Sequence, residues 1–162
     1  MTAPELQLGQ IVFAATPGLS SISEADASRP RSQGKWSRKE IVGHLIDSAS
    51  NNHGRFVRAQ FSDDLVGSTY DQDAWVRVQN YIDAPWAELV TLWSLYNLHL
   101  TRVIAAIPPE ARSRPRVRHN LHEVAFRAIP ASEPATLEYL IQDYVAHLEH
   151  HLAQIFATDA AR

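Results

Sequence analysis

The amino-acid sequence predicts an all-α protein, built as a four-helix bundle with long connecting loops. Apolar residues recur at helical spacing in several separate stretches, and no alternating strand pattern lies between them. Proline-marked connections separate the predicted helices. A chain of 162 residues is long enough for one domain with its own core and too short for two comfortable ones, so residues 1–162 are expected to form a single domain.

The first predicted helix covers Pro4 to Ala15. Pro17 should end or kink it, because proline has no backbone N–H to donate and its ring collides with the preceding turn. The following stretch, Ser20 to Trp36, is rich in Ser, Arg, Pro and Gly. It is predicted to be a loop that carries a helical turn near Ile22.

The second predicted helix marks its own beginning. Ser37 followed three residues later by Glu40 is a capping box, in which each side chain accepts a hydrogen bond from the backbone N–H of the other residue. The helix should run from Arg38 to about Phe61 and then give way to a polar connection, Ser62 to Ile82. Its apolar face is formed by Ile41, Val42, Leu45, Ile46, Ala49, Phe56 and Val57.

The third predicted helix has the most regular apolar stripe. Asp83 is expected to cap its first turn through its carboxylate, with Pro85 tolerated inside that turn. Pro108 and Pro109 should end the helix. The stripe consists of Trp86, Leu89, Val90, Trp93, Tyr96, Leu100, Val103, Ile104 and Ile107.

The last predicted helix follows a long segment without sustained periodicity. Within that segment, which ends at Pro134, residues 119–127 are expected to form a short strand or a turn. Thr136 should then cap the helix through its hydroxyl group. The apolar face of this helix is formed by Leu137, Ile141, Tyr144, Leu148, Leu152 and Ile155.

Composition excludes several classes of partner. The net charge is -3, from 15 Lys and Arg against 18 Asp and Glu, so the chain has no electropositive field for nucleic acid or acidic lipid. No segment approaches the roughly 18 uninterrupted apolar residues of a membrane span, and residues 1–13 lack a secretory signal pattern. We therefore expect a soluble, cytoplasmic protein with no nucleic-acid and no membrane partner. The absence of cysteine leaves imidazoles and carboxylates as candidate metal ligands.

Three histidines form the candidate site. His147 and His151 lie one turn apart, project from the same side of the last helix at about 40° to each other, and border its apolar face. Two imidazoles at this spacing can chelate one divalent ion. His44 lies on the flank of the second helix and can join them if the two helices pack side by side. His150 points about 100° away from His151 and should face solvent or a loop.

The spacing alone leaves another interpretation open. A chain with 8 His in 162 residues contains on the order of 0.4 pairs at this spacing by chance. Histidines at the edge of a helix are more often packed or hydrogen-bonded than bound to metal. We expect such a structural role for His53 and His99, and also for His119 and His122, which lie in the long segment.

A resemblance to a known family adds to this site. Three separated motifs carry it, and they read Trp36-Ser37-x-x-Glu40-Ile41-Val42-x-His44-Leu45-x-Asp47-Ser48-x-x-Asn51-x-x-x-Arg55-Phe56, then Tyr70-Asp71-x-x-x-Trp75, then His147-x-x-x-His151-Leu152-Ala153-x-Ile155. In content and order they resemble the DinB-like superfamily, in particular its YfiT-like branch of metal-dependent hydrolases and thiol transferases.

The resemblance implies a bundle with up-down-down-up topology and a nickel- or zinc-type divalent metal ion held by His44, His147 and His151. Family members with an assigned activity transfer low-molecular-weight thiols such as bacillithiol, mycothiol or glutathione, or isomerise substrates with the help of such a thiol. Dimerisation through a bundle face is common in the family, so a homodimer is expected on the same basis.

Four further residues fall on the quoted motifs and are candidates for substrate binding: Asp47, Arg55, Tyr70 and Trp75. Each has a structural alternative. Asp47 and Arg55 can tie their helix to a neighbouring loop, and Tyr70 and Trp75 can serve as a turn and its hydrophobic anchor.

The function expected from these features is a metal-dependent thiol S-transferase acting on a small molecule. The three-His metal would activate a low-molecular-weight thiol cosubstrate, which a protein without cysteine does not supply itself. Two alternatives share the same residues. One is a hydrolase that uses metal-bound hydroxide, and the other is a non-enzymatic, stress-related binding protein with a structural or vestigial metal. In a third alternative the histidines are polar edge residues and bind no metal.

Overall fold

The architecture is built on four long helices, as a computed structural model of residues 3–157 shows. These are α1 (Pro4–Ser20), α3 (Arg38–Arg58), α5 (Trp86–Ala105) and α8 (Leu137–Phe156). The connections carry α2 (Glu24–Ser28), α4 (Gln72–Val78), the 3-10 helix η1 (Tyr81–Asp83), α6 (Pro109–Ser113) and α7 (Leu121–Val124). Residues 3–157 contain three isolated β-bridges and no strand, which confirms the all-α prediction.

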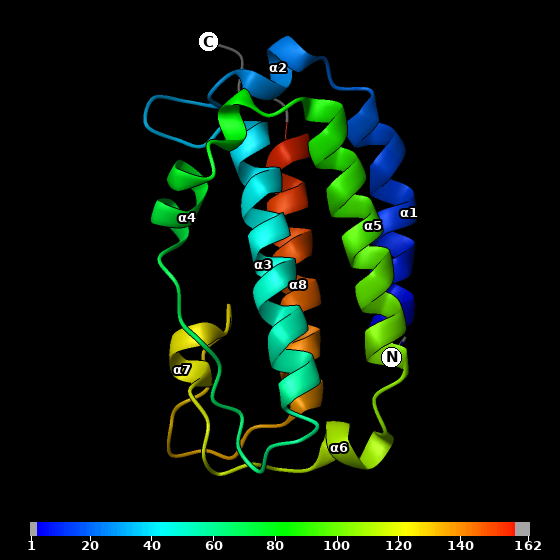
Figure 1. Ribbon diagram of the computed structural model, residues 1–162, viewed down its shortest axis with the longest axis vertical. Helices are drawn as coiled ribbons and strands as arrows, with labels where there is room; N and C mark the ends of the chain where they lie inside the picture. The colour runs from blue at the N-terminus through cyan, green and yellow to red at the C-terminus, as the bar shows by residue number, and fades with distance from the viewer. Residues whose placement is uncertain (1–2, 158–162) are drawn as a thin grey trace.

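The four long helices run up, down, down and up in chain order (Figure 1). Helix α1 packs against α5 and α8, and α3 packs against the same two helices. Because α3 and α5 are consecutive and run in the same direction, the chain between them must return along the whole bundle. Helices α4 and η1 lie on this return path (Figure 1). The topology implied by the family resemblance is therefore confirmed.

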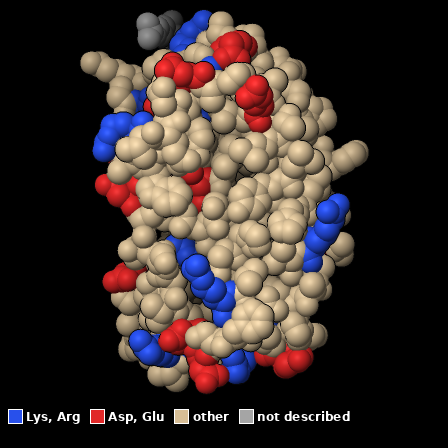
Figure 2. Space-filling model, in the orientation of Figure 1, with Lys and Arg blue, Asp and Glu red and all other residues tan. Residues whose placement is uncertain are grey.

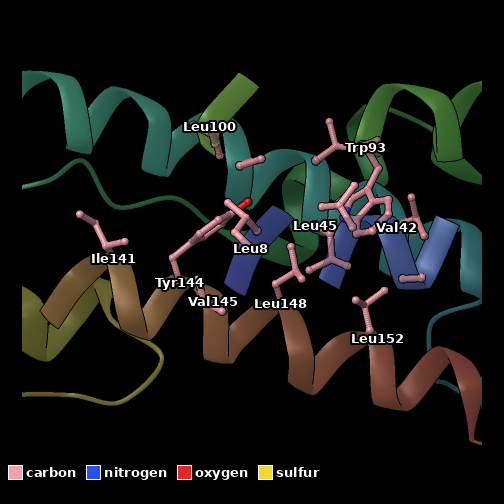
Figure 3. Close-up of a cluster of buried hydrophobic side chains, with 14 of the residues drawn as sticks. Leu8, Val42, Leu45, Trp93, Leu100, Ile141, Tyr144, Val145, Leu148 and Leu152 are labelled. Carbon is pink, nitrogen blue, oxygen red and sulfur yellow. The ribbon is translucent and has the colours of Figure 1, made fainter. Parts of the chain in front are cut away.

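The core lies where the apolar faces of the four helices meet. Figure 3 shows side chains from all four helices directed into one cluster, among them Leu8, Val42, Leu45, Trp93 and Leu148. All five are at most 1% exposed. Such burial is the main source of stability in a bundle, because apolar surface is removed from water.

A polar pair crosses this core. The Tyr144 hydroxyl donates a hydrogen bond of 2.5 Å to Oδ1 of Asn97, and the Asn97 amide donates to the carbonyl of Trp93 at 2.8 Å. Burial raises the pKa of Tyr144, so this hydroxyl keeps its proton. Both buried side chains are therefore satisfied within the protein.

Two predicted helix caps are confirmed. The Ser37 hydroxyl accepts a hydrogen bond from the Glu40 N–H at 3.3 Å, and Oε2 of Glu40 accepts one from the Ser37 N–H at 2.7 Å. Thr136 accepts from the N–H of Tyr139 at 3.1 Å. These caps fix the first residues of α3 and α8, the two helices that carry the candidate histidines.

The predicted cap of the third helix is wrong. Helix α5 begins at Trp86, not at Asp83, and the Asp83 carboxylate accepts from the Asn80 amide at 2.6 Å instead. The N–H of Trp86 donates to Oε2 of Glu24 at 2.9 Å. Glu24 also forms an ion pair with the buried ammonium group of Lys39. The carboxylate of Glu24, which is distant in sequence, thus replaces that of Asp83, because the fold brings α2 to the first residue of α5.

Other helix boundaries differ from the predictions. Helix α1 continues through Pro17 to Ser20; Pro17 is exposed, so the carbonyl that loses its N–H partner is on the solvent side. Helix α3 ends at Arg58 rather than near Phe61. Helical turns occupy 24–28, just after the expected position, and 121–124, where a strand or turn was expected. The connection 62–82 contains α4, whose first turn is capped by Asp71.

The charged side chains form no extended patch of one sign on the face shown in Figure 2. Lys and Arg are interspersed with Asp and Glu there, and most lie towards the two ends of the bundle (Figure 2). Within residues 3–157, no helix combines the length and the apolar character that a membrane span needs. The ends of the predicted 1–162 domain, residues 1–2 and 158–162, lie outside the described residues.

Candidate metal centre

The three candidate histidines meet between α3 and α8. One ring nitrogen from each of His44, His147 and His151 lies within 4.8 Å of those of the other two. The Nε2 atoms of His44 and His147 are 3.1 Å apart. Ring centroids in the trio are separated by 4.6 to 5.1 Å. His150 is exposed and contacts the ring of Phe126 in a neighbouring loop, as helical phase predicted.

Contacts at Nδ1 orient two of the three rings. Nδ1 of His147 is 3.4 Å from the Ser48 hydroxyl, and Nδ1 of His151 is 2.9 Å from Oε1 of Gln154. Nδ1 of His44 is buried and has no hydrogen-bond partner. Because Nδ1 is occupied in His147 and His151, Nε2 is the nitrogen that each of these residues can offer to a metal ion. Outer partners of this kind fix the tautomer and the ring direction of metal-binding histidines.

Burial keeps the three imidazoles neutral. It lowers the pKa of His44 to about 4, with a further contribution from His151. It lowers the pKa of His147 to about 3, where His151, His44 and His150 add to the effect. The pKa of His151 is also lowered, mainly by burial and in part by His150, against the raising effect of Gln154. The neutral form is the one that binds metal, so no proton needs to leave at neutral pH.

The geometry fits a divalent ion. Nitrogen ligands of zinc lie at about 2.0–2.1 Å, which places two of them about 3.3 Å apart in a tetrahedral site. The 3.1 Å between Nε2 of His44 and Nε2 of His147 agrees with that spacing. Three nitrogen ligands leave one position for a substrate, which is the arrangement of catalytic rather than structural zinc sites.

Two cavities reach the trio from different sides. One, of about 300 Å³, is lined by His147, His151, Arg55, Tyr70 and Phe126 among others. The other, of about 570 Å³, is lined by His151 together with Arg31, Lys35, Trp36, Asp73 and Gln154. His151 therefore belongs to both walls, and His147 lines the smaller cavity as well.

Arg55 and Tyr70, two of the predicted substrate residues, line the 300 Å³ cavity together. Arg55 is buried on α3, where its guanidinium donates to the Ser68 carbonyl at 2.7 Å and to Oδ1 of Asn52 at 3.3 Å. Burial raises the pKa of Tyr70 to about 12, although the positive charge of Arg55 lowers it. Tyr70 thus keeps its proton and can donate a hydrogen bond in the cavity.

Asp47 and Trp75, the other two predicted substrate residues, make structural contacts. The Asp47 carboxylate accepts from the Tyr81 hydroxyl and from the Gln79 amide, both at 2.7 Å. Burial raises its pKa. The ring of Trp75 packs against that of Tyr70, with a distance of 5.0 Å between the ring centroids. These contacts agree with the structural alternatives given above, in which Asp47 ties its helix to a neighbouring loop and Trp75 is a hydrophobic anchor.

Three residues near the histidines were missed from the sequence. The Trp36 ring lies 5.1 Å from that of His44, and the Phe126 ring lies 5.4 Å from that of His147. Gln154 binds His151. Gln154 could have been found, because three residues along a helix place two side chains on one face. Phe126 gave no such signal, since only the folding of its loop brings it to α8.

The remaining histidines have structural contacts. His53 lies 3.3 Å from the Tyr96 hydroxyl and packs against His99 at 5.1 Å. His119 is buried, with Nε2 at 2.6 Å from the Glu133 carbonyl and Nδ1 accepting from the Leu121 N–H. His122 pairs with its neighbour Glu123. Among the described residues, the group able to hold a metal ion is the trio alone.

Comparison with known proteins agrees with this arrangement. A relative from Bacillus subtilis (strain 168), YfiT, whose name gives it as a candidate metal-dependent hydrolase, is 25% identical over 135 residues. That alignment covers 83% of this chain and 70% of YfiT. The solved structure of YfiT, described as having an unusual four-helix bundle topology, superposes with a TM-score of 0.74 at 22% identity, over 93% of this chain and 81% of that one.

A second solved structure shares the fold. The mycothiol-dependent maleylpyruvate isomerase superposes with a TM-score of 0.68 at 12% identity, over 98% of this chain and 65% of that one. The family model of the DinB superfamily matches residues 14–155, which include all three histidines and every motif residue named above. The branch that the motifs resemble agrees with the similarity to YfiT. The chain therefore belongs to the DinB superfamily.

Proposed function

We propose that this protein is a metal-dependent S-transferase, in which a divalent ion such as zinc or nickel at His44, His147 and His151 serves the transfer of a low-molecular-weight thiol to a small electrophile. One observation supports a reaction of two substrates in particular: His151 lines two separate cavities, of about 300 and 570 Å³. A thiol and an electrophile can thus approach His151 from two cavities. The mycothiol-dependent isomerase with the same fold supports a thiol as one of the two.

The residues of the chain prepare this site in three ways. Ser48 and Gln154 hold the rings of His147 and His151 in orientation. Burial keeps all three imidazoles neutral, so their lone pairs are available. When bound, the divalent ion supplies Lewis acidity, which lowers the pKa of a thiol or of water beside it. The protonated Tyr70 hydroxyl can then orient a polar group of the substrate in the cavity.

The test combines metal analysis with a transfer assay. Purified protein is loaded with zinc or nickel in turn, freed of excess ion and assayed with bacillithiol, mycothiol or glutathione against 1-chloro-2,4-dinitrobenzene. In this reaction the thiol sulfur bonds to the ring carbon, chloride leaves and the thiol proton goes to buffer. We expect about one ion per chain and metal-dependent thiol consumption.

The variants His44→Ala and His147→Ala should lose both the ion and the turnover, and His53→Ala should keep both, since His53 contacts Tyr96 and His99 instead. Protein that takes up neither ion, or His147→Ala with an unchanged rate, would contradict the proposal.

Hydrolysis is the second candidate, favoured by the name of the relative YfiT. The same ligands would serve it, with water in place of the thiol. A panel of esters and amides assayed with and without thiol separates the two. Turnover that needs no thiol supports the hydrolase, and turnover that rises with thiol concentration supports the transferase.

A further inference from the structure

A buried guanidinium without an acidic partner lies beside the metal centre. Arg55 is 9% exposed, and among the described residues no carboxylate forms an ion pair with it. Its Nε atom is buried and has no hydrogen-bond partner. Its two hydrogen-bond acceptors, the Ser68 carbonyl and the Asn52 amide oxygen, are neutral.

The other buried cations are compensated better. Lys39 pairs with the Glu24 carboxylate. Arg116 donates hydrogen bonds to three backbone carbonyls, and the negative charges of Asp63 and Asp64 act to raise its pKa. Burial is the main influence on the pKa of both arginines and lowers it; two carboxylates oppose this effect at Arg116, whereas Tyr70 is the one group that opposes it at Arg55. A buried charge without compensation is costly, so a partner from outside the chain would stabilise it.

The position of Arg55 suggests what that partner is. Its side chain lines the same 300 Å³ cavity as His147 and His151. Arg55 follows Ser48, the residue in contact with His147, by seven positions on α3, which is about 10 Å along a helix. A ligand with an anionic group at Arg55 can therefore place a reacting atom near the trio.

The acidic residues of this cavity are already engaged. Both oxygens of Asp143 accept backbone N–H bonds, from Phe126 and Arg127, at 2.7 Å each. Glu123 accepts from Asn120 at 3.2 Å and lies 3.7 Å from His122. Neither carboxylate forms an ion pair or a hydrogen bond with the Arg55 guanidinium.

We propose that Arg55 binds a carboxylate of the small-molecule substrate, so that the cavity selects molecules with an anionic group. Arginine is suited to this role because its planar fork donates two parallel hydrogen bonds to a carboxylate. This inference rests on the proposed function for the reacting atom, but the binding of the anion needs no metal. Its test therefore uses metal-free protein and is independent of turnover.

The experiment compares benzoate with benzamide, which have nearly the same shape and differ in charge. Isothermal titration of the metal-free wild type should show benzoate binding at least about 10-fold more tightly than benzamide, because a hydrogen bond between two charged groups is stronger than one to a neutral group. Arg55→Met should remove this preference. Arg55→Lys should keep part of it, because lysine retains the charge and loses the fork. The control Arg102→Met, at an exposed position of α5, should bind as the wild type does.

Gly67→Ala tests the same site without removing a charge. A Cβ atom at residue 67 would lie 2.8 Å from Nε of Arg55 and 3.0 Å from its Cδ, so the side chain must move. We expect weaker benzoate binding in this variant. If Arg55→Met does not fold, the benzoate affinity of Gly67→Ala serves as the test of whether Arg55 binds the anion. Equal binding of benzoate and benzamide by the wild type, or unchanged benzoate binding in both Arg55→Lys and Gly67→Ala, would overturn the proposal if S-methylglutathione and its diethyl ester give the same result.

Either the thiol or the electrophile can carry the carboxylate. S-methylglutathione and its diethyl ester test the thiol side, and benzoate with benzamide tests a simple aromatic acid. An Arg55-dependent preference for the acid in either pair supports the proposal and identifies the source. No Arg55-dependent preference in either pair overturns it, whatever the activity of the metal-loaded protein.

Discussion

At the scale of single residues, the candidate centre depends on side chains that hold the histidines as well as on the histidines. Oε1 of Gln154 accepts a hydrogen bond from Nδ1 of His151 at 2.9 Å, and the Ser48 hydroxyl lies 3.4 Å from Nδ1 of His147. His44 lacks such a partner at Nδ1, and the ring of Trp36 packs beside it instead. Two ligands are thus oriented by hydrogen bonds, and the third is held by packing.

The role of Gln154 can be measured directly. Replacing Gln154 with Ala leaves Nδ1 of His151 without its partner, and loss of such an outer contact lowers metal affinity by about 10- to 100-fold. Competition with a chromophoric chelator measures this change. Gln142→Ala is the matched control, because Gln142 is exposed on the same helix and binds Glu138. Equal affinities of the two variants would show that the Gln154 contact does not orient the ligand.

The residues of the site were predictable to different degrees. Helical phase placed His147 and His151 together and turned His150 away, because both statements concern one rigid helix. That His44 meets them depends on the packing of α3 against α8, and the motif resemblance supplied that expectation. Phe126 comes from a connection without periodicity, so nothing in the local sequence linked it to His147.

At the scale of elements, helix beginnings with local caps were predictable and the beginning of α5 was not. Ser37 with Glu40, and Thr136, lie next to the backbone groups that they bind. Helix α5 is capped by Glu24, which is far away in sequence. A helical turn was expected near α2, but the short helices α4 and α6 escaped prediction because tertiary contacts, rather than a long apolar stripe, support them.

The Glu24 contact predicts a pH-dependent contribution to stability. Hydrogen bonds from Lys39 and from the Trp86 N–H hold the pKa of Glu24 below its ordinary value of 4.5. A carboxyl group whose pKa is lower in the folded state stabilises the fold above its unfolded pKa, and this contribution is lost as pH falls through the folded value. Glu24→Gln should therefore lower the Tm at pH 7, and the difference from the wild type should shrink below pH 4.5.

Glu88→Gln is the control for this comparison. Glu88 lies in the first turn of the same helix, is exposed, and should change the Tm little. A Glu24→Gln variant whose deficit in Tm stays constant down to the acid transition would show that the carboxylate charge is not what stabilises the contact.

Gly43, inside α3, allows the connection between α3 and α5 to pack closely against this helix through Tyr81. The ring of Tyr81 lies so close to Gly43 that an added Cβ atom would overlap it. Alanine normally stabilises a helix interior by about 1 kcal/mol relative to glycine. Here we expect the opposite sign, a loss of about 1–3 kcal/mol from overpacking, because Tyr81 must also leave Asp47. Urea unfolding of Gly43→Ala measures this loss.

Gly54 provides the matched position on the same helix. A Cβ atom there would make only an ordinary contact of 3.6 Å with the Arg58 guanidinium. Gly54→Ala should leave stability unchanged or raise it by up to about 1 kcal/mol. If both variants change stability by the same amount, the contact between Tyr81 and α3 does not constrain residue 43.

At the scale of the whole molecule, the candidate metal centre lies beside the core and does not replace it. The side chains of the core come from all four long helices (Figure 3). Three ligands from two helices that already pack together add little to the definition of the fold. We therefore expect the fold not to depend on an ion, in contrast to small metal domains, in which the ion supplies the folding free energy.

The separation leads to a prediction for metal removal. Metal-free protein should keep its helical circular dichroism and melt cooperatively. Zinc or nickel at about 100 times its Kd should then add about 2.7 kcal/mol to the free energy of unfolding, which corresponds to a rise in Tm of about 5–10 °C for a chain of this size. His44→Ala and His147→Ala should remain folded and show no such rise. Metal-free protein that has lost its helices would instead identify the ion as structural, because only then does the bundle depend on the ion to form.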